Sequence, residues 1–63
     1  MMVDWKDAVG KKVLVRKRYS PGERIYEVYV VELSPSGKYA KIRRGWVEEW
    51  IDTENYVILE VLA

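Results

Sequence analysis

The stretch that decides the fold is "IYEVYVVEL", residues 25–33. It contains three Val, one Ile and two Tyr, and such β-branched and aromatic residues favour extended strands. The segments "SPGE" (20–23) and "SPSG" (34–37) flank it, and Ser, Pro and Gly favour chain reversal. The sequence therefore predicts a strand over residues 25–33 with a turn on each side.

Four further strands are predicted around this one. They cover residues 11–19, 38–43, 46–50 and 56–62. Gly45, in the dipeptide "RG", can supply the positive φ of a tight hairpin turn. The segment "DTEN" (52–55) predicts a short helical turn that Asp52 caps. The chain is therefore expected to alternate strands with short turns.

The N-terminal residues predict a helical turn that packs on the strands. Asp4 can cap the segment "DWKDAV", and Gly10 can end it. A turn this short is not stable alone, so its apolar residues must dock as a lid. These residues are Val3, Trp5, Ala8 and Val9.

The order of these elements resembles the SH3-like small β-barrel. This resemblance implies one mainly all-β domain over residues 1–63, with a helical lid (1–10) and a five-stranded barrel (11–62). The acidic, tyrosine-rich first loop of peptide-binding SH3 domains is absent, because the loop here is "RYSPGER". Recognition of Pro-rich peptides is therefore not implied. Small archaeal chromatin proteins have a comparable shape, but this chain lacks their high lysine content.

The predicted core draws on all five strands and on the helical turn. It consists of Trp5, Val9, Val13, Val15, Val28, Val31, Leu33, Ala40, Ile42, Val47, Trp50, Val57 and Leu59. Since the chain contains no Phe, three Trp and five Tyr supply all of its aromatic bulk. Most of these aromatic residues are expected to be structural.

The segment "WVEEWI", residues 46–51, conflicts with simple alternation. Either register turns one of its two glutamates inward, and an unpaired buried charge costs several kcal/mol. A β-bulge at the glutamates would place Val47 and Trp50 in the core and leave both carboxylates in water. We favour this interpretation, in which Trp46 is the more exposed indole.

Composition excludes several classes of site. The chain has no Cys and no His, so it lacks thiolate and imidazole ligands and the commonest general base. No nucleophile–base pair can be assembled, so we expect no enzyme, no cofactor and no metal. The acidic cluster Glu48, Glu49, Asp52 and Glu54 lacks a Gly-containing loop that would converge on a cation, and is expected to be a solvated face.

The charges are balanced overall but segregated along the chain. The net charge is +1, which is not typical of a dedicated nucleic-acid binder. Residues 11–18 and 38–44 carry nine of the eleven basic side chains, whereas residues 45–63 carry five acidic residues and no basic one. If these segments fall on different faces, the molecule is dipolar. Apolar runs are short, so we expect no membrane-spanning helix, no secretory signal and a cytoplasmic location.

Two functional hypotheses remain. The first is a non-catalytic protein-interaction module, with self-association as a variant of it. The second is a nucleic-acid-binding barrel that uses a basic and aromatic sheet face. The competing structural interpretation of that face is the solvated side of a sheet. The candidate binding residues are Tyr39, Lys41, Arg43, Arg44 and Trp46, with Arg16 and Arg18 adding phosphate contacts.

The absence of Gln and the single Asn, together with abundant charge, fit the composition of thermophile proteins. We therefore expect a thermophilic microbe, or one of its mobile elements, as the source.

Overall fold

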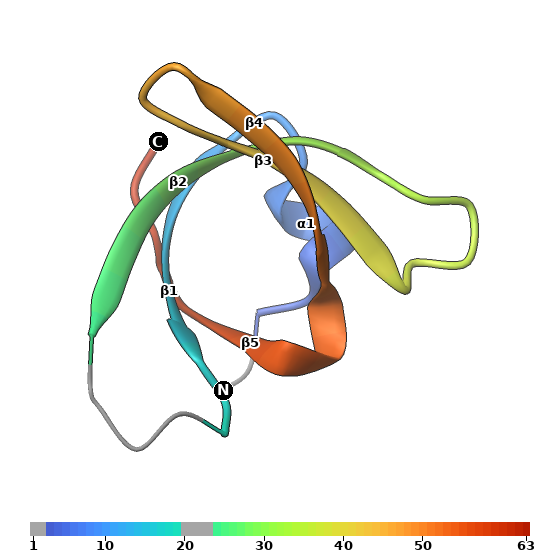
Figure 1. Cartoon of the computed structure of the whole chain (residues 1–63), viewed down its shortest axis with the longest axis horizontal. Helices are drawn as coiled ribbons and strands as arrows, with labels where there is room; N and C mark the ends of the chain where they lie inside the picture. Colours follow the sequence, from blue (N-terminus) through green and yellow to red (C-terminus); the bar gives the residue numbers. More distant parts are fainter. Residues whose placement is uncertain (1–2, 20–23) are drawn as a thin grey trace.

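The computed structural model describes residues 3–19 and 24–63, in which five antiparallel strands form one curved sheet (Figure 1). The elements are α1 (Trp5–Ala8), β1 (Lys12–Lys17), β2 (Ile25–Leu33), β3 (Tyr39–Arg44), β4 (Val47–Asp52), the 3-10 turn η1 (Thr53–Asn55) and β5 (Tyr56–Val61). The predicted all-β class is confirmed, and the elements follow the predicted order. The turn predicted at residues 20–23 lies outside the described residues.

The strands are arranged in the order β4-β3-β2-β1-β5. In the part of the chain that the structure describes, β4 and β5 are the two edges, and no ladder joins them. The sheet nevertheless curls around a common interior, and η1 connects one edge strand to the other (Figure 1). The structure is thus a strongly curved five-stranded sheet, with closure of a barrel by strand pairing not shown.

The long strand β2 is shared between its two neighbours. Its first half pairs with β1, from Ile25 to Tyr29, and its second half pairs with β3, from Tyr29 to Leu33. The pairing with β3 shifts by one residue at Val31, because Val30 faces Ile42 whereas Glu32 faces Lys41. This shift is a β-bulge, which adds one residue to β2 and increases its bend.

The bulge corrects one of the predicted core positions. Val30 is fully buried, whereas Val31 is only partly buried, so the prediction that Val31 belongs to the core is wrong. Past the bulge the alternation is displaced by one residue, and Leu33 packs against the core three positions after Val30. Extra residues of this kind change which face the following side chains occupy.

A second bulge has the same effect on β5. Leu14 faces Glu60 whereas Val15 faces Ile58, so Leu59 is an extra residue in β5. Ile58 is buried and Val61 packs on the core, whereas Leu59 is exposed and Val57 is only partly buried. The core positions predicted at Val57 and Leu59 are therefore wrong, because the alternation was assigned to the opposite face.

The buried core lies between the sheet and α1. It consists of Ala8, Val13, Val15, Val28, Val30, Ala40, Ile42, Ile51 and Ile58, with Val3, Trp5, Tyr26, Leu33, Tyr56 and Val61 packed against it. Five of the buried positions were predicted: Val13, Val15, Val28, Ala40 and Ile42.

The helical turn forms as expected from its cap. The Lys6 amide donates a hydrogen bond to the Asp4 carboxylate (3.1 Å). Ala8 is fully buried, and Gly10 follows with a φ of 81°, a conformation that glycine adopts without strain. Val9 is exposed, contrary to its predicted core position. Among the described residues, no helix has the length and apolar character needed to cross a membrane.

Candidate functional site

The β3–β4 hairpin carries most of the candidate residues, and its register is uninterrupted. Tyr39 faces Asp52 at one end, and Arg44 faces Val47 at the other. The bulge predicted at the two glutamates is therefore wrong. Ile51 is the buried residue of β4, whereas Val47 and Trp50 are 55% and 50% exposed. Neither of these two residues belongs to the core, contrary to the prediction.

Neither glutamate of β4 is buried, because the part of the hairpin that carries them is exposed on both sides. Glu49 lies on the same side of β4 as Ile51, yet it is exposed. All residues from Arg43 to Trp50 are exposed, and the turn end of the hairpin projects beyond the neighbouring strands (Figure 1). Alternation is thus strict in β4, but only Ile51 reaches the interior.

The outer side of this hairpin forms a defined surface, which we call the hairpin face. β3 contributes Tyr39, Lys41 and Arg43, and β4 contributes Glu48, Trp50 and Asp52, since the neighbouring Ala40, Ile42 and Ile51 point inward. Lys41 is directly opposite Trp50, and Arg43 is directly opposite Glu48. Cross-strand neighbours on one face lie close enough for their side chains to interact.

Glu48 holds both basic side chains of the hairpin face. Its carboxylate lies 3.5 Å from Lys41 Nζ and 3.5 Å from Arg43 Nη1. The Arg43 guanidinium also lies over the Tyr29 ring, 4.9 Å from its centroid. One carboxylate therefore pairs with both of the cations that would attract a phosphate backbone, and the Tyr29 ring also attracts the Arg43 guanidinium.

The structure does not bring the seven predicted residues onto one surface. Trp46 is at the hairpin turn and is 101% exposed, whereas Tyr39 begins β3 at the far end of the hairpin. Five residues of strand separate the two, or roughly 17 Å. Arg44 points to the opposite side of β3, where its guanidinium lies 5.0 Å from the centroid of Tyr26.

Arg16 in β1 and Arg18 just after it also lie away from the hairpin face. Arg16 lies on β1 between Ile25 of β2 and Val57 of β5. Arg18 follows β1 and donates from Nε to the Glu54 carbonyl oxygen (2.9 Å). Because β2 lies between β1 and β3, these arginines are about 10 Å or more from the basic side chains of β3.

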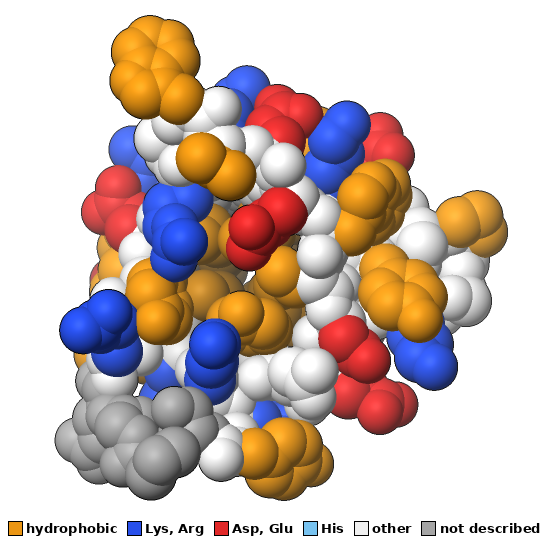
Figure 2. Space-filling model, in the orientation of Figure 1, with side chains coloured by type: hydrophobic (Ala, Val, Ile, Leu, Met, Phe, Trp, Pro, Cys, Tyr) orange, Lys and Arg blue, Asp and Glu red, His pale blue; other side chains and the backbone are white. Residues whose placement is uncertain are grey.

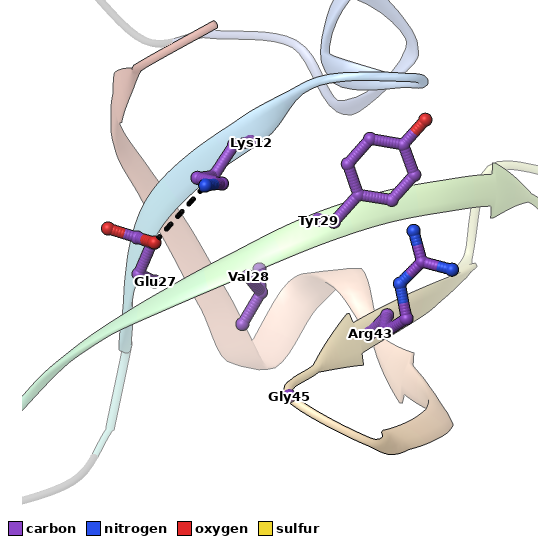
Figure 3. Close-up of a pocket in the computed structure, with 6 residues that line it drawn as sticks. All are labelled: Lys12, Glu27, Val28, Tyr29, Arg43 and Gly45. Carbon is purple, nitrogen blue, oxygen red and sulfur yellow. Dashed lines mark ion pairs between the residues drawn. The ribbon is translucent and has the colours of Figure 1, made fainter.

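A shallow hollow of about 270 Å³ opens where the hairpin diverges from β2 (Figure 3). Its lining residues are Lys12, Glu27, Val28, Tyr29, Arg43 and Gly45. Lys12 and Glu27 form an ion pair of 3.6 Å across one side of it. Sequence patterns could not indicate this hollow, because it depends on the angle at which the hairpin leaves the sheet.

The charged side chains are interspersed rather than separated. The acidic strand β4 pairs with the basic strand β3, and Glu60 of β5 faces Leu14 of the basic strand β1. Figure 2 accordingly shows Lys and Arg side chains alternating with Asp and Glu side chains over this side of the molecule. In the described part of the chain the oppositely charged segments lie beside one another, so the condition for the expected dipole, that they fall on different faces, is not met.

Sequence reasoning missed two features of the hairpin. Trp50 is predicted in the core and Glu48 on a solvated acidic face, whereas Trp50 lies on the hairpin face and Glu48 pairs there with Lys41 and Arg43. Both features follow from the β3–β4 register. A two-residue turn at 45–46 sets this register, so that turn is the sequence signal that could have identified them. Within the described ranges, no three Asp or Glu side chains gather closely enough to hold a metal ion.

Comparison with protein-family models, with curated proteins and with solved structures finds no match to this chain.

Proposed function

We propose that this protein is a non-catalytic protein-interaction module whose partner contacts the β3–β4 hairpin. The observation that carries this proposal is the pair of exposed indoles, Trp46 at the turn and Trp50 on the hairpin face. Trp, Tyr and Arg dominate the binding energy of protein interfaces, and the hairpin face adds Tyr39 and Arg43 to the indoles. Exposing so much aromatic surface is costly unless a partner covers it.

The pairing of the basic residues favours a protein over a nucleic acid as the partner. Lys41 and Arg43 share the carboxylate of Glu48, so the hairpin face offers aromatic surface with little net charge. Nucleic-acid affinity depends mainly on uncompensated Lys and Arg side chains that displace counterions from phosphates. Protein interfaces combine aromatic residues with a polar, solvent-accessible rim.

Comparative capture tests this function. The wild-type protein, a Trp46→Ser/Trp50→Ser double variant and a Tyr19→Ser control are immobilised and exposed to the same cell extract, and captured proteins are quantified. Tyr19 is exposed outside the hairpin, so its loss matches the aromatic change without touching the hairpin face. We expect at least one protein to be retained by the wild type and the control and lost by the double variant. Equal capture by all three would contradict the proposal.

The alternative, nucleic-acid binding, is supported by the side-by-side placement of Tyr39, Lys41 and Arg43 on one strand. Titration of labelled duplex and single-stranded DNA at low salt separates it from the first function. Binding would fall with rising salt, and Arg43→Ala would reduce the slope of log K against log salt by about one. The absence of binding at tens of micromolar protein would remove this alternative.

The proposed source, a thermophilic microbe or its mobile element, has an independent test. Domains from mesophiles melt at about 45–65 °C, so a melting temperature clearly above that range, followed by circular dichroism, would support a thermophilic source. Melting within the mesophile range would count against it.

A further inference from the structure

We propose that the free edge of β4 binds an extended basic segment of the partner as an added antiparallel strand. This inference rests on the proposed function and specifies how the partner is held. In β-strand addition, main-chain hydrogen bonds supply affinity, and side chains on either side of the strand supply specificity.

The register of the hairpin determines which backbone groups of β4 are free. Arg44 faces Val47 across a two-residue turn, so these residues form the hydrogen-bonded pair that closes it. Since hydrogen-bonded and non-hydrogen-bonded pairs alternate, Val47, Glu49 and Ile51 direct their backbone groups toward β3. The Thr53 amide continues this series by donating to the Lys38 carbonyl oxygen (2.9 Å).

The remaining residues of β4 direct their N–H and C=O groups away from the sheet. These residues are Glu48, Trp50 and Asp52. β4 is an edge of the sheet, and four consecutive residues, 47–50, are exposed. A row of backbone groups that has no strand partner among residues 3–19 and 24–63 is a template for another strand.

The side chains of β4 do not block access to its outward N–H and C=O groups. Glu48 leans back over β3, where Lys41 and Arg43 hold its carboxylate. Trp50 provides an exposed apolar ring above the edge, and Val47 provides an exposed aliphatic side chain on the opposite side of the strand. A strand added here would therefore find apolar contacts on both of its faces.

The charge of β4 indicates which kind of segment would pair with its free edge. β4 carries Glu49 and Asp52, for which no ion pair is found among the described residues, beside Glu48, whose carboxylate Lys41 and Arg43 already hold. Residues 45–63 contain no Lys or Arg. A second copy of this edge, paired antiparallel, would bring carboxylates together in the registers centred on Glu48, Glu49 or Trp50. Centring on Glu48 or Glu49 places that residue opposite itself, and centring on Trp50 places Glu48 opposite Asp52. An extended segment rich in Lys or Arg would instead complement the edge and could place a cation over Trp50.

The test uses the full-length protein labelled with ¹⁵N and a capped heptapeptide of alternating Lys and Val as the probe. We expect the largest amide shifts at Glu48, Trp50 and Asp52, together with slowed hydrogen exchange of these amides. The same peptide with N-methyl groups at alternate residues, which cannot donate along the edge, is the control. Absence of shifts at about 1 mM peptide, or equal shifts with the N-methylated peptide, overturns the proposal.

A matched pair of variants tests the main-chain contact from the protein side. Trp50→Pro and Trp50→Ala both lack the indole, but only proline lacks the outward N–H, which makes no bond to β3. Peptide affinity should be about tenfold lower for the proline variant than for the alanine variant. Equal peptide affinities of these two variants overturn the proposal. If the proline variant does not fold, the comparison of the plain and N-methylated peptides on the wild type still tests the main-chain contact.

Two outcomes separate this proposal from the function on which it rests. If the double Trp variant loses a captured partner but the Lys–Val peptide does not bind, the hairpin is an interaction site that works through side chains alone. The strand-addition proposal then fails and the proposed function stands. If neither experiment shows binding, both fail.

Discussion

Glu48 organises the outer face of the β3–β4 hairpin. Its carboxylate lies between Lys41 and Arg43, and Arg43 in turn stacks on Tyr29. Because these side chains are partly exposed, each ion pair contributes little to stability. The main effect of Glu48 is therefore on the charge that the hairpin presents to a partner.

Replacing this carboxylate should change binding more than stability. Glu48→Gln should lower the free energy of unfolding by less than about 1 kcal/mol, measured by urea denaturation. It should also release two cations, so the variant should elute from a heparin column at higher salt than the wild type. Glu60→Gln, with the same change of net charge on β5, is the control. Identical elution of the two variants would show that Glu48 does not mask the basic side chains.

The three large residues of β4 and its turn should differ in their contribution to the free energy of unfolding. Ile51→Ala should cost about 2–4 kcal/mol, because it removes a buried side chain. Trp50→Ala should cost about 1 kcal/mol, because the indole is half exposed. Trp46→Ala should leave the denaturation midpoint unchanged. A large loss for Trp46→Ala would contradict its position at the hairpin turn.

At the scale of elements, Thr53 joins η1 to the loop between β2 and β3. Its hydroxyl is within hydrogen-bonding distance of the Gly37 and Lys38 carbonyl oxygens, 2.9 Å from each, and its amide donates to Lys38. The same loop is held by the Ser34 hydroxyl, which accepts from the Tyr39 amide (3.0 Å). Residues 34–38 are therefore a fixed corner at the start of β3.

Removal of the Thr53 hydroxyl should loosen this corner. Thr53→Val keeps the shape of the side chain but leaves the carbonyl oxygens without this donor, and should cost about 1–2 kcal/mol. Thr53→Ser keeps the hydroxyl and should cost less. Urea denaturation measures both, and hydrogen exchange at Lys38 and Tyr39 locates the effect. A Val variant as stable as the Ser variant would show that the hydroxyl contributes nothing.

Local patterns predicted the elements well but not every face of the strands. The bounds of β2 were predicted to the residue, and the caps at Asp4 and Asp52 form as expected. In β2 the error lies at the bulge at Val31, and in β5 the alternation was assigned to the opposite face; in both strands neighbouring positions carry similar apolar side chains. Val30 and Val31 are chemically identical, so only the pairing with β3 decides which one is buried.

The candidate surface was harder to predict than the fold. The presence of Tyr39, Lys41 and Arg43 on one side of β3 follows from alternation alone. The partnership of Lys41 and Arg43 with Glu48 depends on the β3–β4 register, and the separation of Arg16 from the hairpin depends on strand order. Both are tertiary features that no local pattern specifies.

At the scale of the whole molecule, the strand order places acidic segments beside basic ones. The carboxylates of β4 also disfavour pairing of that edge with a second copy. The two basic segments become β1 and β3, and each has an acidic segment beside it. In the registers centred on Glu48, Glu49 or Trp50, self-pairing of the free β4 edge would also bring carboxylates together. We therefore expect a monomer at neutral pH and low salt, measured by light scattering at several concentrations. A dimer under these conditions would show that another surface associates.

The sharing of β2 between β1 and β3 has a consequence for the order of folding. The β2–β3 and β3–β4 ladders join neighbours in the chain, whereas the β1–β5 ladder pairs Val13 with Val61, 48 residues apart in the sequence. Contacts between distant residues close slowly, so the meander through β2, β3 and β4 should assemble first. In stopped-flow experiments, Ile42→Val should mainly slow refolding, and Ile58→Val should mainly accelerate unfolding. The strand that completes the sheet would then be the first to leave it.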